Sequence, residues 1–167
     1  MVSNTKSPTR RTVSESARVR IVPAEAWHCF AVGAKLRPDD LMEVRHASGD
    51  MDPGKALDDS RLKHPGTMAA LVGGMPMVIF GCHAKRGVGV PWMVATREVD
   101  RMPVLLTRSA RRIVSKWKER YGTLANTVWS ESRAVGWLPL LGFRIEEAFQ
   151  AQCFGGGTAT YRWFRMD

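Results

Sequence analysis

Alternating and helical patterns of apolar residues divide the first third of the chain. Residues 18–22, Arg-Val-Arg-Ile-Val, alternate charged and apolar side chains, which predicts a strand with one buried face. A proline then opens a predicted helix over residues 24–34. A second proline, followed by two acids, predicts another helix over residues 39–46. Residues 48–66 hold many charges among several Gly and Pro residues, which predicts a long surface loop.

Two apolar runs joined by a pair of glycines predict a β-hairpin in the middle of the chain. The runs cover residues 67–72 and 75–82, and the Gly-Gly pair between them is a two-residue turn signal. The later apolar runs predict, in chain order, strands over 88–95 and 124–129, a short helix over 131–141 that Pro139 should bend or shorten, and strands over 143–153 and 158–164.

The clearest helix in the sequence is predicted over residues 104–121. Pro103 stands at its start and Gly122 follows its end. Apolar residues recur at helical spacing and share one face: Leu106, Ala110, Ile113, Val114, Trp117 and Tyr121. The opposite face is basic: Arg108, Arg111, Arg112, Lys116 and Lys118.

Charge is concentrated in two segments. The chain has 167 residues and a net charge of +9, and residues 1–20 carry +4 while residues 97–120 carry +5. Such asymmetry favours an anionic partner, either nucleic acid or an acidic protein surface. Candidate contacts are Arg10 and Arg11 near the N-terminus and the five basic residues of the predicted helix. A basic helix face that is merely solvated is the alternative.

Composition sets the domain organisation and excludes several classes of protein. Residues 1–17 are rich in Ser, Thr and Arg and nearly lack large apolar residues, so we expect a flexible basic arm. Residues 18–167 suit one domain. No run of about 18 apolar residues and no secretory signal occur, so we expect a soluble intracellular protein with no membrane partner.

The cysteines and histidines give no predicted metal site. Cys29, Cys82 and Cys153 lie far apart and show no paired spacing, so we expect free thiols. A zinc site built from His64, Cys82 and His83 is rejected because neighbouring residues on a strand point to opposite faces.

The order of predicted elements resembles that of the GNAT acetyltransferases. Residues 128–143, Val-Trp-Ser-Glu through Leu-Gly-Phe, resemble the family's C-terminal signature. Residues 67–149 are also similar to GNAT-like proteins of short-tailed bacteriophages, some of which are internal virion proteins. The resemblance implies an α/β (α+β) fold. It consists of one domain with a central mixed, mostly antiparallel sheet flanked by helices, preceded by the arm.

Two departures from the family pattern bear on chemistry. The stretch Arg101–Leu106 corresponds to the family's Gly-rich turn that binds the CoA pyrophosphate, but Val104 and Leu106 occupy the small positions. Pro103 also removes a backbone donor there, so we expect this pocket to be closed. The position of the family's general-acid Tyr holds Leu138, and its Asn position holds Glu131. Because Leu cannot transfer a proton, we expect no catalytic residue and no cofactor.

The sequence therefore predicts a non-catalytic virion or assembly protein of a short-tailed phage. We expect its partners to be portal, tail or fibre components bound through the arm, and DNA is a further candidate for the basic helix. Multiple copies would be present in the virion, after residence in the host cytoplasm before assembly. Two alternatives stay open: an acetyl-CoA-dependent N-acetyltransferase with an altered cofactor loop and an open cleft between the fourth and fifth strands, and a sequence-independent DNA-binding protein.

Overall fold

The computed structural model describes residues 19–167. The predicted arm, with Arg10 and Arg11, lies outside the described residues. The strands are β1 (Val19–Pro23), β2 (Met68–Val72), β3 (Met75–Lys85), β4 (Val88–Ala95), β5 (Leu124–Trp129), β6 (Arg144–Gln152) and β7 (Thr158–Met166). The α-helices are α1 (Ala26–Gly33), α2 (Pro38–Ser48), α3 (Pro53–Lys63), α4 (Pro103–Tyr121) and α5 (Ala134–Trp137), and the short 3-10 helices are η1 (Arg97–Arg101) and η2 (Leu138–Leu141).

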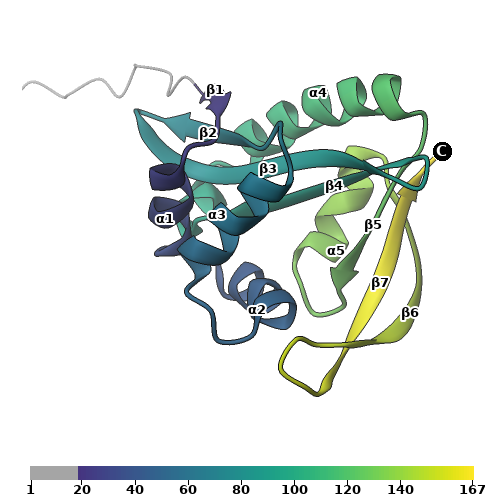
Figure 1. Cartoon of the computed structure of the whole chain (residues 1–167). Coiled ribbons are helices and arrows are strands. Elements are labelled where there is room, and N and C mark those ends of the chain that lie inside the picture. The colour runs from purple at the N-terminus through teal and green to yellow at the C-terminus, as the bar shows by residue number, and fades with distance from the viewer. Residues whose placement is uncertain (1–18) are drawn as a thin grey trace, which may run out of the picture.

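The strands form one seven-stranded sheet in the order β1-β2-β3-β4-β5-β7-β6. Every neighbouring pair is antiparallel except β4 and β5, which are parallel. Helices α1 and α3 cover one face of the sheet and α4 lies along the other, while the β6–β7 hairpin leans away from the first strands (Figure 1). The predicted fold class, a mixed and mostly antiparallel sheet flanked by helices, is confirmed.

The core consists of three apolar clusters separated by the sheet. On one face, Ile79 and Val94 pack with Leu57 of α3 and their neighbours from α1. On the other face, Phe80 and Ala95 pack against the apolar side of α4. The third cluster joins α4 and the α5 region to β5, β6 and β7. Alternate residues of the same strand thus serve opposite layers, as the period-two side-chain alternation of a strand requires.

Most predicted elements are present close to their predicted bounds. Both the middle hairpin and the strands over 88–95 and 124–129 are confirmed, and the amphipathic helix begins one residue earlier than predicted. The predicted helix over 131–141 is divided into α5 and η2, with Pro139 in the second part. No helix within residues 19–167 is long and apolar enough to cross a membrane.

The prediction of a loop over residues 48–66 is wrong, because residues 53–63 form α3. Asp52 caps this helix by accepting a hydrogen bond from the Lys55 N–H at 2.9 Å, and Pro53 fits the first helical position. A Lys55–Asp59 ion pair of 2.9 Å lies one turn apart on the surface. Leu57 is the one large apolar side chain that α3 buries. So narrow an apolar stripe gives little periodicity for sequence analysis to detect.

Two glycines allow α1 and α3 to pack at close range. A Cβ atom built on Gly33 would lie 2.5 Å from the Gly54 nitrogen. A Cβ atom on Gly54 would lie 2.6 Å from Phe30 Cδ1 and 2.8 Å from Phe30 Cα. The helix contact is therefore made between backbones, with no room for a methyl group on either side.

We predict that Gly54→Ala destabilises the protein by about 1–3 kcal/mol, because the methyl group must push α1 and α3 apart. The matched control is Gly136→Ala in α5, where a Cβ atom has nothing within 4 Å. That variant should be neutral or slightly stabilising, because Ala favours helix. Denaturant-induced unfolding checks both variants, and equal stability of the two would contradict the close packing.

Candidate functional site

The sheet opens between β4 and β5. The two parallel strands share a single residue pair, Gly89 with Leu124, and the Gly89 N–H donates to the Thr123 carbonyl at 2.9 Å. Gly89 is required at this point, because a Cβ atom would lie 2.7 Å from the Leu124 side chain and 2.8 Å from the Tyr121 ring. Beyond this pair the strands diverge and leave their facing backbone groups without the ladder that joins parallel strands.

Asn126 bridges the gap where the strands separate. Its side-chain N–H donates to the Pro91 carbonyl of β4 at 2.9 Å. Its side-chain oxygen accepts from the N–H of Thr127 at 2.8 Å. A side-chain amide offers both a donor and an acceptor, so it replaces part of the missing ladder. Pro91 has no N–H to leave unpaired on β4.

The gap between the diverging strands belongs to a cleft with a volume of about 710 Å³. Its walls come from strands β1 to β5, from α4 as far as Trp117, and from α2 and α3 on the opposite face of the sheet. Most lining side chains are apolar, and Glu43, His64 and Asn126 are among the polar ones. Mostly apolar walls with a few polar groups are typical of small-molecule sites.

Acidic side chains of α2 hold the far ends of both diverging strands. Asp40 Oδ2 accepts a hydrogen bond from the Ala95 N–H at the end of β4, at 2.8 Å. Glu43 Oε1 accepts from the Trp129 N–H at the end of β5, at 3.3 Å. The two acids are three residues apart and therefore lie on one side of the helix. Helix α2 thus spans the open end of the cleft.

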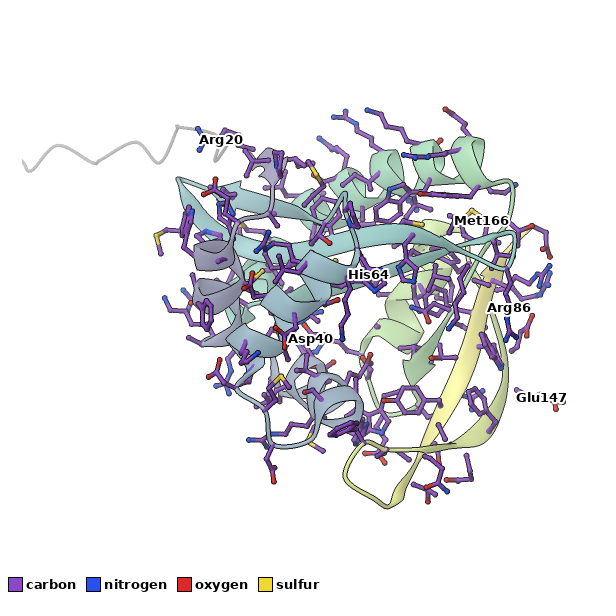
Figure 2. The ribbon with its side chains drawn as sticks, viewed as in Figure 1. Arg20, Asp40, His64, Arg86, Glu147 and Met166 are labelled. Atoms are coloured by element: carbon purple, nitrogen blue, oxygen red, sulfur yellow. The ribbon has the colours of Figure 1, made fainter. Side chains whose placement is uncertain are left out.

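Ion pairs fix α2 to the segments around it. Arg37 Nε contacts Asp40 Oδ2 at 2.8 Å, and both side chains are buried. Asp39 Oδ2 accepts from the backbone N–H of Arg133 at 3.0 Å and from its guanidinium at 3.1 Å. Arg133 also contacts Asp100 of η1 at 2.6 Å. The network therefore joins α2 to η1 and to the segment before α5, and Figure 2 shows Asp40 near the centre of the molecule.

The three acids of α2 titrate differently. Burial raises the pKa of Asp39, but the hydrogen bond from the Arg133 N–H and the nearby guanidiniums outweigh it and the net pKa is lowered. Burial raises the pKa of Asp40 despite its bonds with Arg37 and Ala95. Burial also raises the pKa of Glu43 to about 7, against the opposing hydrogen bond from Trp129. Glu43 is therefore partly protonated near neutral pH.

Two histidines stack at the edge of the cleft. The rings of His64, after α3, and His83, on β3, lie 3.9 Å apart with an interplanar angle of 13°. Burial, together with His64 and Lys85, lowers the pKa of His83. Cys82 packs on the other face of the sheet, as the alternation of a strand predicts. No group of three or more metal-ligating side chains occurs within residues 19–167.

Comparison with solved structures gives many matches, and the three described here have low sequence identity. A GNAT-family acetyltransferase from Bacillus anthracis matches with a TM-score of 0.66 and 14% identity, over 90% of this chain and 96% of that one. The ribosomal-protein-S18-alanine N-acetyltransferase from Escherichia coli matches with a TM-score of 0.62 and 11% identity, over 89% and 93%. A GCN5-related N-acetyltransferase from Brucella melitensis matches with a TM-score of 0.63 and 15% identity, over 95% and 79%.

The chain has the GNAT fold. No protein-family model and no curated protein sequence matches it. At these identities the likeness extends to the fold alone.

The turn that enters α4 is the segment that the sequence resemblance aligns with the GNAT cofactor turn. Pro103 occupies the first helical position, and no side chain caps the helix. The Leu106 N–H donates to the Met102 carbonyl at 3.0 Å, so the N–H groups of Val104 and Leu105 are the free ones in this first turn. Val104 is 70% exposed, whereas Leu106 packs into the core. The cleft between β4 and β5 is open in this structure.

Leu138, which the sequence resemblance aligns with the family's general acid, lies in an apolar environment. Leu138 begins η2, is 7% exposed and belongs to the core cluster beneath α4. Neither tyrosine of the chain lines the cleft. Tyr121 donates to the Cys82 carbonyl at 3.3 Å, and the Tyr161 hydroxyl lies 2.9 Å from His46 Nδ1. Glu131, at the family's Asn position, is exposed.

The predicted basic face of α4 is on the surface. Arg108, Arg111, Arg112 and Lys116 are exposed, whereas Lys118 is half-buried. Arg111 donates to the Leu140 carbonyl at 2.8 Å, which ties one of these residues to η2. The structure does not bring these residues into the cleft. They form a separate surface on the outer side of the helix.

Sequence analysis missed the residues of α2 that shape the cleft. Asp39 and Asp40 were interpreted as favourable charges in the first turn of a helix, and Glu43 gave no signal. Their roles depend on β4 and β5 ending beside α2, which is a tertiary contact. The one local sign is three acids within five residues on a helix that begins beside Arg37.

We predict that Glu43→Gln changes how stability depends on pH. In the folded protein Glu43 keeps its proton up to about pH 7, whereas the unfolded chain loses it near 4.5. The parent's free energy of unfolding should therefore fall as pH rises through this window. At about pH 8 the variant should be more stable by about 1–3 kcal/mol, and near pH 4 the two should be equal.

Thermal unfolding across this pH range measures the effect. The control is Glu147→Gln, on the exposed side of β6 at the periphery of the molecule (Figure 2), which should leave the profile unchanged. A Glu43→Gln protein less stable than the parent at high pH would show that the carboxylate is needed in its charged form.

Proposed function

We propose that this protein is a non-catalytic virion or assembly protein of a short-tailed bacteriophage, built on a GNAT fold. The observation that carries the non-catalytic part is Leu138. The acetyltransferase signature places its general acid there, and here an apolar side chain is committed to the core. The start of α4 supports the same proposal, because Pro103 removes a donor and Val104 adds bulk where the cofactor phosphates would approach.

The phage part of the proposal rests on the similarity of residues 67–149 to GNAT-like phage proteins. In this proposal the domain is a scaffold, present in several copies, that docks on portal, tail or fibre components. Two surfaces are available for docking: the basic side of α4 and the arm that carries Arg10 and Arg11. The protein would be made in the host cytoplasm and end in the virion.

The first test is acetyl-CoA binding by calorimetry on the full chain at tens of micromolar. We expect no detectable heat, because the entrance to α4 offers fewer backbone donors than a Gly-rich turn and a bulkier surface. The Escherichia coli ribosomal-protein-S18-alanine N-acetyltransferase, which shares the fold, serves as the positive control. One-to-one saturable binding would overturn the non-catalytic proposal.

One observation favours a second function, an N-acetyltransferase with an altered cofactor turn. Glu43 lines the open cleft, and its pKa of about 7 suits a general base at neutral pH. If acetyl-CoA binds, acetyl transfer to amines should follow, and Glu43→Gln should lower kcat/KM at least tenfold with little change in acetyl-CoA affinity. Transfer unaffected by this substitution would exclude Glu43 as the base.

Sequence-independent DNA binding is the remaining alternative, and the exposed basic residues of α4 are what supports it. It requires affinity for duplex DNA that falls steeply as salt rises, because each neutralised phosphate releases bound counterions. Base-reading motifs are missing from the sequence, so no preference among duplexes is expected.

A further inference from the structure

The strand β1 is an edge of the sheet and borders a groove. Within residues 19–167, β1 pairs with β2 on one side only. Alternate residues of such a strand direct their N–H and C=O groups away from the sheet, where another strand can pair with them. A groove of about 220 Å³ runs between this edge and α4. Figure 1 shows β1 at the rim of the sheet, with α4 along the face behind it.

The groove has an apolar floor and a basic wall. Val19 and Ile21 of β1 and Ile113 of α4 supply the apolar side chains, and Ile21 is 42% exposed. Arg112 and Lys116 of α4 supply the positive charge. Neither forms an ion pair with an acid of residues 19–167. An exposed isoleucine beside two such cations forms a surface that is complementary to a partner with both apolar and acidic groups.

The spacing of the basic wall matches that of an added strand. Arg112 and Lys116 are four residues apart, so their positions lie about 6 Å apart along α4. Side chains on one face of a strand repeat about every 6.6–6.8 Å. A strand laid along β1 with glutamates at alternate positions would therefore place one carboxylate near each cation. The two methylene groups of each glutamate would cover the apolar floor.

We propose that the β1–α4 groove is a docking site for an extended acidic segment of a partner protein, which adds to the sheet as an eighth strand beside β1. This deepens the proposed function, on which it rests for the existence of a partner, by naming the surface and the chemistry recognised. Backbone pairing supplies affinity without sequence preference, and the basic wall favours a strand with acidic side chains at alternate positions.

Charge and shape favour this occupant over two others. A nucleic acid would engage the cations but has no backbone amides to pair with β1 and no use for the apolar floor. The chain's own first 20 residues carry a net charge of +4, so they would be repelled by Arg112 and Lys116. An acidic protein strand can pair with the edge of β1, cover the apolar floor and contact the basic wall.

The test is a titration of the full chain with the capped peptide Thr-Glu-Val-Glu-Val-Glu-Thr, followed by ¹H–¹⁵N NMR. We expect the largest shifts at the amides of residues 19–22 and 108–116, with weaker binding as salt rises. The double variant Arg112→Glu/Lys116→Glu should bind about tenfold more weakly or worse, since two attractive exposed pairs become repulsive. The matched control, Arg45→Glu/Arg86→Glu, makes the same charge change on α2 and in the β3–β4 turn. It should bind like the parent, and Figure 2 shows Arg86 far from Arg20 of β1.

Further probes distinguish an acidic strand from the other candidate occupants of the groove. The peptide with prolines in place of its valines keeps its charge but loses backbone donors, and it should bind at least tenfold more weakly. Equal binding by this peptide, or shifts produced by a short DNA duplex and not by the acidic peptide, would overturn the proposal. So would a deletion of residues 1–17 that leaves the outward amides of β1 exchanging faster, since the arm would then be the occupant. Acetyl-CoA is absent from the peptide titration, so calorimetry with acetyl-CoA tests the non-catalytic assignment separately.

Discussion

The architecture depends on the two hydrogen bonds by which α2 holds the ends of β4 and β5. Parallel strands that part after one residue pair leave backbone donors that the sheet cannot satisfy, and buried donors without partners are costly. Asp40 and Glu43 accept the donors at the two strand ends. The cost is partial burial of acids, offset for Asp40 by Arg37 and expressed in Glu43 as a raised pKa. The opening in the sheet is therefore stabilised by a helix lying outside it.

This arrangement separates the fold from any one chemistry. The cleft is open and its walls are mostly apolar, while Pro103 and Val104 begin α4 and Leu138 begins η2. The polar side chains that line the cleft include Glu43, the stacked histidines and the bridging amide of Asn126. The GNAT fold does not by itself determine one chemistry, because strand ends and helix α2 fix its shape while chemistry depends on a few replaceable side chains.

The fold was largely predictable because its strongest elements are locally encoded. Alternation and turn glycines define β2 to β4, and one apolar stripe defines α4. Helix α3 was missed because Leu57 is its one large buried apolar residue, so its stability comes from the Asp52 cap and from contact with α1 through Gly54. The α2 acids were missed for a related reason. The sequence of a helix does not show whether a carboxylate faces water or, as Glu43 does, a strand end 86 residues later.

The narrow junction at Gly89 bears on how substitutions can alter the cleft during evolution. Within residues 19–167, one backbone pair joins the first four strands to the last three, so each half of the sheet keeps its own register whatever the distance between the halves. Elsewhere the halves are joined by side chains, among them Asn126 across the gap and the acids of α2 at the far end. Substitutions on α2 can therefore widen, narrow or re-line the cleft while every strand retains its partners. Side chains that line the cleft can therefore be replaced without loss of strand pairing. In a closed sheet, a new cavity would first have to break hydrogen bonds between strands.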